Sequence, residues 1–158
     1  MSTDTTLPNC SVLVRSPIRA AVSRHFTKRQ LEKVVQQLVR AEKTGKRSLS
    51  ILLTTDSEIR KLNKRYRAKD KATDVLSFPV DAKSPLFHQS LGDLVISWET
   101  TKTQAKEYNT TIREEFLRLL VHGFLHLCGY DHENVSAKEA KRMQDREALL
   151  RRRAKFSR

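Results

Sequence analysis

The chain of 158 residues is 38% hydrophobic and 31% charged, a balance typical of one folded domain over residues 1–158 and unlike that of a disordered protein. Its formal net charge of +13 favours a polyanionic partner. No stretch is apolar enough for a membrane-spanning helix, so we expect no membrane partner. Residues 1–9 lack the pattern of a signal peptide, which favours a cytoplasmic protein. We expect these nine residues to be flexible.

The N-terminal half carries two strand patterns and two helix patterns in alternation. Thr27 and Gln30 form a capping box, in which each side chain accepts a hydrogen bond from the backbone N–H of the other residue. Apolar residues then recur at helical spacing until Gly45, which is typical of an amphipathic helix. In chain order, we expect a strand at 10–15, a loop at Pro17, a helix between Thr27 and Gly45, a strand at 48–55 and a helix capped by Thr55.

The C-terminal half adds two strands and three helices. Pro79 lacks a backbone N–H, so its strand should lie at an edge of the sheet. The run from Phe116 to Cys128 is apolar nearly all round and predicts a central helix. We therefore predict an α+β (mixed α/β) fold, with one small mixed sheet of about four strands packed with about five helices. The expected elements are strands at 74–79 and 91–97, a helix from Trp98 to about Tyr108, a helix from Thr111 to Gly129 and a basic helix from Ser136.

The positive charge gathers in two clusters. Seven cations and one acid lie between Arg60 and Lys71, and nine cations and three acids lie from Lys138 to the C-terminus, which ends in a basic tail at 153–158. Two separate clusters favour a nucleic acid, although a solvated helix face explains the second cluster equally well. Aromatic residues are not interleaved with these cations, so we expect contact with the phosphate backbone rather than stacking on bases.

Three histidines have the spacing of metal ligands. His122 and His126 are four residues apart, which places both imidazoles on one face of the central helix. Gly129 allows the chain to reverse, so His132 can supply a third ligand just past the helix end. Three imidazoles with a fourth position open are typical of catalytic zinc, although such triads also accept nickel, cobalt and copper. We expect one zinc ion on the central helix and the following turn, and we assign no role to His25 or His88.

The same stretch overlays the metzincin peptidase pattern H-E-x-x-H-x-x-G-x-x-H at every fixed position except one. Gly123 stands where those peptidases have the glutamate that deprotonates water. Met143 falls within an amphipathic helix pattern and is expected in the core, so the Met-turn of that class is also missing. A metallopeptidase therefore becomes the minority interpretation.

Three motifs resemble those of a known family. Residues 62–79 (LNKRYRAKDKATDVLSFP), 91–97 (LGDLVIS) and 121–133 (VHGFLHLCGYDHE) occur in the order and at the separations of the YbeY family. This family comprises bacterial rRNA maturation factors described as zinc-dependent, single-strand-specific endoribonucleases. The resemblance covers the chain from about residue 48 to residue 133 and leaves the N-terminal forty residues and the basic tail unexplained.

The resemblance implies roles for individual residues. It makes His122, His126 and His132 the metal ligands, with Arg67 and His122 catalytic in the hydrolysis of RNA phosphodiester bonds. It places the protein in 16S rRNA maturation and ribosome quality control, with rRNA and the small ribosomal subunit as partners, and with a small-subunit ribosomal protein or an assembly GTPase as a further partner. The planar guanidinium of Arg67 suits a phosphate in the transition state, and the alternative is one more surface cation.

Two positions depart from the family pattern. Ala68 stands where the family commonly has glycine and Ala72 where it often has proline, and both changes should alter loop stiffness more than chemistry. The residue that moves the proton stays open. Each candidate aspartate also has an ordinary interpretation as a turn or capping residue, while an edge facing the metal is expected from two strand residues. The candidates are Asp131, Asp74 and Asp93, and the edge residues are Ser77 and Phe78.

Two functions compete with a metal-dependent endoribonuclease. One is a non-catalytic ribosome assembly factor, in which the metal only braces the fold and the charge binds RNA. The other is the metallopeptidase that Gly123 disfavours.

Overall fold

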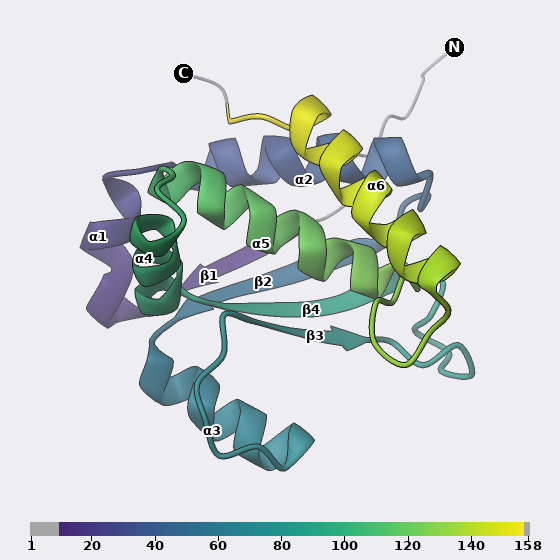
Figure 1. The fold of residues 1–158 in the computed structure, drawn as a ribbon, viewed down its shortest axis with the longest axis horizontal. Coiled ribbons are helices and arrows are strands. Elements are labelled where there is room, and N and C mark those ends of the chain that lie inside the picture. The colour runs from purple at the N-terminus through teal and green to yellow at the C-terminus, as the bar shows by residue number, and fades with distance from the viewer. Residues whose placement is uncertain (1–9, 157–158) are drawn as a thin grey trace.

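A computed structural model of the protein describes residues 10–156. The expected flexibility of residues 1–9 lies outside the described residues, as do the last two positions of the basic tail. Strands and helices alternate only in part along the described chain, which ends in three successive helices (Figure 1). They are β1 (Cys10–Val14), the 3-10 turn η1 (Ser16–Ile18), α1 (Arg19–Ser23), α2 (Lys28–Glu42), β2 (Ser48–Thr54), α3 (Asp56–Arg67), β3 (Val75–Pro79), β4 (Ser90–Ser97), α4 (Trp98–Glu107), α5 (Ile112–Leu127) and α6 (Ala137–Arg153).

The four strands form one mixed sheet in the order β1-β2-β4-β3. β1, β2 and β4 are parallel neighbours, and β3 runs antiparallel to β4. Helices α1 and α2 connect β1 to β2, because parallel neighbours need a crossover connection rather than a tight turn. The predicted α+β fold with a small mixed sheet is confirmed, and β3 with Pro79 lies at an edge, as expected.

One face of the sheet carries the main hydrophobic core. All helices except α3 lie on this face, and α5 crosses its middle (Figure 1). Phe116 and Phe124 of α5 are fully buried, and Met143 of α6 packs into the same core, as predicted. Because each large buried apolar side chain contributes about 1.5–3 kcal/mol, this packing stabilises the position of α5 on the sheet.

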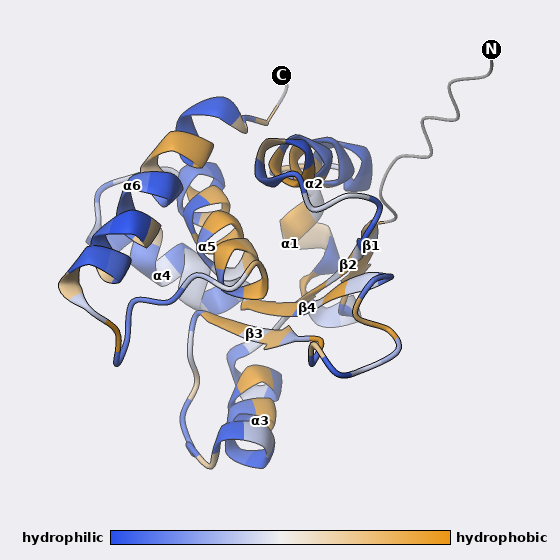
Figure 2. Cartoon of the chain, turned by 90° about the vertical axis from the view of Figure 1, so that its right-hand side faces the viewer, coloured by the Kyte–Doolittle hydropathy of each residue, from blue (hydrophilic) through white to orange (hydrophobic). Residues whose placement is uncertain are grey.

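Helix α3 lies on the opposite face of the sheet (Figure 2). Ile59 of α3 packs there with Leu76 and Val95 in a small second cluster. The helix ends at Arg67, and the next residue, Ala68, has a φ of 56°. This left-handed conformation costs an alanine roughly 1 kcal/mol, so the departure at Ala68 falls on a backbone position that favours glycine.

Local sequence signals placed the helix starts correctly. Each predicted cap residue has a side-chain oxygen that accepts a hydrogen bond from a backbone N–H of the first helical turn, which satisfies a group that the helix leaves unpaired. These residues are Thr27, Thr55, Ser97, Thr111 and Ser136.

The expected loop at Pro17 was wrong. The structure has η1 and α1 there, which makes six α-helices within residues 10–156 instead of about five. Ile18 and Val22 are buried against the core and hold this segment. A helix of five residues is too short to show periodicity in a sequence, so packing decides its form. No helix among the described residues is long and apolar enough to cross a membrane.

Candidate metal centre

Helix α5 presents His122 and His126 from one face. Thr111 and Glu114 close a capping box at its start, and the buried residues of the helix fix its rotation against the sheet. The Nε2 atoms of the two histidines lie 3.2 Å apart. The prediction that both imidazoles point to one place is confirmed.

The turn after α5 brings the third histidine to the pair. Gly129 has a φ of 96°, a conformation that favours glycine, and it reverses the chain at the helix end. The ring of His132 then lies 5.0 Å from that of His122 and 5.1 Å from that of His126, measured between centroids. One ligand atom from each histidine lies within 4.8 Å of the others, so the three residues can hold a metal ion.

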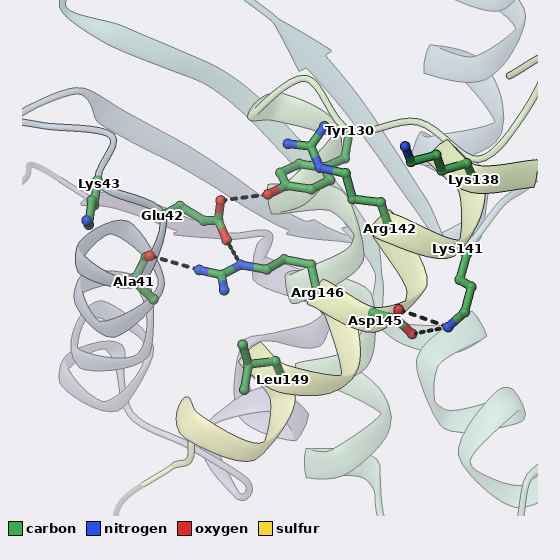
Figure 3. Close-up of a pocket in the computed structure, with 10 residues that line it drawn as sticks. All are labelled: Ala41, Glu42, Lys43, Tyr130, Lys138, Lys141, Arg142, Asp145, Arg146 and Leu149. Atoms are coloured by element: carbon green, nitrogen blue, oxygen red, sulfur yellow. Dashed lines mark hydrogen bonds and ion pairs between the residues drawn. The ribbon is translucent and has the colours of Figure 1, made fainter. Parts of the chain in front are cut away.

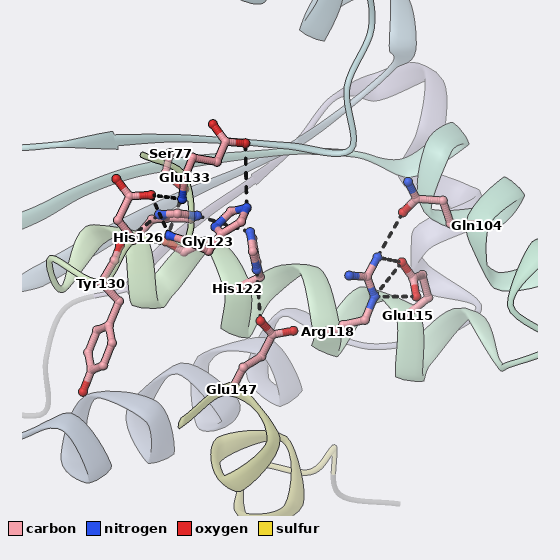
Figure 4. Close-up of polar contacts among 12 residues, drawn as sticks. Ser77, Gln104, Glu115, Arg118, His122, Gly123, His126, Tyr130, Glu133 and Glu147 are labelled. Carbon is pink, nitrogen blue, oxygen red and sulfur yellow. Dashed lines mark hydrogen bonds and ion pairs between the residues drawn. The ribbon is translucent and has the colours of Figure 1, made fainter. Parts of the chain in front are cut away.

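A hydrogen bond at Nδ1 orients each histidine of α5 (Figure 4). Nδ1 of His122 lies 3.0 Å from Oε2 of Glu147 on α6, and Nδ1 of His126 lies 3.0 Å from the carbonyl oxygen of Tyr130. Since the carbonyl accepts only, the proton of neutral His126 sits on Nδ1, and an ionised Glu147 fixes the proton of His122 in the same way. The two Nε2 lone pairs then face each other.

His122 and His126 have the separation expected of two nitrogen ligands on one metal ion. Two facing lone pairs repel unless a cation lies between them, and about 3.3 Å separates neighbouring nitrogens around a tetrahedral zinc with bonds of about 2.0–2.1 Å. The observed separation of 3.2 Å between the Nε2 atoms of His122 and His126 agrees with this value. The donor set therefore suits a divalent metal with nitrogen ligands.

The electrostatics of the site favour the same protonation states. Burial lowers the pKa of His126, and the neighbouring His122 and His132 lower it further, so its imidazole is neutral and available as a ligand. Burial raises the pKa of the Glu147 carboxyl, but the hydrogen bond with His122 and the nearby Arg118 outweigh burial and leave the pKa lowered. Glu147 is therefore an anion that can accept the proton of His122.

A cavity of about 700 Å³ opens over the histidines, and we call it the metal cleft. It is lined by the histidine triad together with Arg67, Lys69 and Lys71. Arg67 Nη2 donates to the carbonyl oxygen of Ser77 at 2.6 Å, and its guanidinium carbon lies 5.7 Å from the Phe78 ring centroid. The structure thus brings Arg67 to the predicted ligands from the end of α3, although 55 residues of sequence separate it from His122.

Helix α5 approaches β3 and β4 closely at Gly123. A Cβ atom at this position would lie 2.8 Å from Leu94 Cδ2 and 3.1 Å from Val75 Cγ2. The Ser77 hydroxyl, from β3, donates to the Gly123 carbonyl oxygen at 3.2 Å. A glutamate at this position would require the Leu94 side chain to shift, so the packing as well as the residue type disfavours that peptidase base.

The three candidate aspartates occupy different surroundings. Asp131 Oδ1 accepts from the backbone N–H groups of His132 and Glu133, and these hydrogen bonds lower the pKa of an exposed turn residue. Asp74 lines the metal cleft and accepts from the Val75 N–H at 2.7 Å. Asp93 is excluded as the residue that moves the proton at the metal cleft, because it lines a groove on the α3 side of the sheet.

The expectation that Ser77 and Phe78 face the metal was right for Ser77 and wrong for Phe78. Ser77 lines the metal cleft, whereas Phe78 lines the groove on the α3 side and packs against Tyr66, with 5.5 Å between ring centroids. Neither of the two unassigned histidines joins the triad: His25 contacts Trp98, and His88 contacts Phe87.

Sequence reasoning missed Glu147. A signal for it was present, since Met143, Glu147 and Leu150 follow one another at spacings of four and three, and both apolar neighbours are buried. A carboxylate on the buried stripe of a helix needs a partner, and that partner is His122.

Comparisons with known proteins agree on one family. The family model described as Endoribonuclease YbeY matches residues 18–155. A protein of Persephonella marina named Endoribonuclease YbeY is 47% identical over 124 residues, which is 78% of each chain. A protein of the same name from Aquifex aeolicus is 45% identical over 75% of this chain and 78% of its own. The solution structure of TM1509 from Thermotoga maritima is 26% identical, covers 92% of this chain and 88% of its own, and has a TM-score of 0.62.

Proposed function

Because the chain belongs to the YbeY family of endoribonucleases, we propose that it is a zinc-dependent hydrolase that cleaves single-stranded RNA at the metal cleft. The observation that carries this proposal is the convergence of three histidines and Arg67 on one cavity. His122, His126 and His132 would hold the ion. A zinc ion held in this way supplies Lewis acidity toward phosphoryl oxygens and makes water acidic enough to act as a nucleophile near neutral pH.

The residues of the chain would bind and orient the phosphate. Arg67 can place two N–H groups on phosphate oxygens and stabilise the charge that develops there, because its guanidinium is planar and permanently charged. The hydrogen bond to the Ser77 carbonyl aims this side chain. Lys69 and Lys71 line the same cleft and add positive charge around the entering strand.

Two features support catalysis over a bracing role for the metal. Phe116 and Phe124 are fully buried in the main core and attach α5 to the sheet, so the position of this helix does not depend on the triad alone. His132 is exposed and the cleft is open above it, which leaves room for a substrate. A peptidase is disfavoured because Gly123 supplies no carboxylate at the position of the glutamate of that class, and its surroundings are closely packed.

The proposed substrate is rRNA of the small ribosomal subunit, cleaved during 16S maturation and ribosome quality control. The net charge of +13 suits a large polyanion, and the family name specifies an endoribonuclease. The proposed partner is the small ribosomal subunit, with one of its proteins or an assembly GTPase as a further partner.

The test compares wild-type protein with His126→Ala in two assays. Elemental analysis measures bound metal, and cleavage of single-stranded and duplex 16S fragments is followed with and without a chelator. We expect near-stoichiometric zinc and chelator-sensitive cleavage of single strands in the wild type, and a loss of both in the variant. A variant that loses the metal but cleaves as before would refute the proposed role of the metal.

A further inference from the structure

A second cavity, of about 660 Å³, lies between the end of α2 and the first turns of α6 (Figure 3). We call it the α2–α6 cavity. Two acids, Glu42 and Asp145, face five cations in its lining, so it carries a net charge of +3. The five cations are Lys43, Lys138, Lys141, Arg142 and Arg146.

Ion pairs within the cavity involve two of these cations and leave the other three without an ion pair. Arg146 pairs with Glu42 and donates to the Ala41 carbonyl oxygen at 2.9 Å, and Lys141 pairs with Asp145 at 2.9 Å. The other cations form no ion pair with any residue in the described part of the chain. They are Lys43, Lys138 and Arg142, and all three are exposed. A concave surface with three unpaired cations favours an anionic ligand.

The α2–α6 cavity adjoins the metal cleft through a single residue. Tyr130 lines both cavities. Its carbonyl oxygen accepts from His126 on the cleft side, while its hydroxyl donates to Glu42 at 3.2 Å on the cavity side. The Arg142 guanidinium carbon lies 4.7 Å from the centre of the Tyr130 ring. A strand that leaves the metal cleft over Tyr130 therefore meets Arg142 first.

We propose that Lys43, Lys138 and Arg142 bind backbone phosphates of the substrate RNA beyond the phosphate that is cleaved. The inference rests on the proposed function, because a strand whose scissile phosphate lies in the metal cleft must lay its neighbouring phosphates on adjoining surfaces. An anionic polymer gains by releasing counterions wherever such a surface is positive. The basic residues of α6 then have a role that the family motifs leave open.

The experiment removes the three charges and compares two substrate lengths. The triple variant Lys43→Gln, Lys138→Gln, Arg142→Gln is measured beside a matched control, Arg24→Gln, Lys102→Gln, Lys106→Gln. The control removes three exposed cations, one from the residue that follows α1 and two from α4, and both helices lie at the other end of the sheet (Figure 1). Zinc-loaded proteins cleave single-stranded RNAs of about four and about sixteen nucleotides, lengths that bracket common single-strand binding sites.

For the longer RNA we expect a higher KM in the triple variant. Its KM should also depend less on salt, because each lost phosphate contact on a single strand lowers the slope of log K against log salt by about 0.7. Three contacts lower it by about 2, so between about 50 and 200 mM NaCl the wild-type KM should rise roughly twentyfold more than that of the variant. The shorter RNA and the control variant should behave as wild type.

Equal salt slopes in the triple variant and the wild type would overturn the inference, as would an equal loss in the control or on the shorter RNA. Wild-type kinetics on RNA together with lost binding of a polyglutamate peptide would assign the cavity to an acidic peptide and overturn it too. A wild-type protein that cleaves neither RNA would refute the proposed function itself, which is a distinguishable result.

Discussion

The metal cleft and the α2–α6 cavity lie on the two sides of Tyr130. They differ in how firmly their functional side chains are oriented. In the metal cleft, a hydrogen bond orients each of three functional side chains: His122 by Glu147, His126 by the Tyr130 carbonyl and Arg67 by the Ser77 carbonyl. In the α2–α6 cavity, Lys43 and Lys138 are exposed side chains without ion pairs. Chemistry at a phosphate requires fixed geometry, whereas holding a flexible polyanion requires only charge. The two sites should therefore respond differently to conservative substitutions.

The largest difference is expected for Arg67→Lys. The charge is kept, but the planar fork that can bind two phosphate oxygens is lost, so kcat should fall on the order of 10²–10³-fold, as when one transition-state donor is removed. The matched change Arg142→Lys, in the α2–α6 cavity, should leave kcat and KM within about twofold, because that site reads charge alone. The single-turnover cleavage rates of the two variants test this prediction. Equal rates would contradict the distinction between the two sites.

Glu147→Gln should have the next largest effect, and on metal affinity. The amide keeps the shape of the side chain but removes the negative charge that fixes the proton of His122, so zinc affinity should fall about 10–100-fold. Competition with a chromogenic chelator measures this directly.

Asp145→Asn is the control for Glu147→Gln. It lies on the same helix, pairs with Lys141 and lines the α2–α6 cavity. Its zinc affinity should equal that of the wild type. If the two variants lost zinc equally, α6 would affect the site through its general packing rather than through the Glu147 carboxylate.

The smallest effect is expected for Ala68→Gly, next to Arg67. Glycine adopts the left-handed conformation without strain, so the free energy of unfolding should rise by up to about 1 kcal/mol. Urea denaturation measures the change. Cleavage should stay at the wild-type rate, since the Ser77 carbonyl orients Arg67; a slower variant would show that stiffness at the end of α3 also positions the guanidinium.

The predictions that succeeded depended on local geometry. His122 and His126 share a helix face because residues four apart do so in any α-helix, and Thr111 caps that helix through a contact three residues away. The turn at Gly129 that brings in His132 is equally local. Each of these contacts spans so few residues that the rest of the fold hardly affects it.

Apart from the loop at Pro17, the expectation that failed concerned which face of the sheet a residue occupies. Ser77 and Phe78 were both expected at the metal, yet neighbouring strand residues point to opposite faces, and only Ser77 reaches the cleft. Asp93 likewise lies on the α3 side. Alternation was visible in the sequence, but which of the two faces carries α5 was not, because it depends on how the helices pack around the sheet.

The sequence by itself determined the three clustered histidines, the helix caps, the mixed sheet and the excess of positive charge. Only the tertiary structure decided what surrounds the triad: Glu147 reaches His122 across 25 residues, and Tyr130 reaches Glu42 across 88. The physical reason is the range of the contacts. Helix and turn geometry specify neighbours within one or two turns, whereas the packing of α5 and α6 over the sheet brings distant side chains together and separates the metal cleft from the α2–α6 cavity at Tyr130.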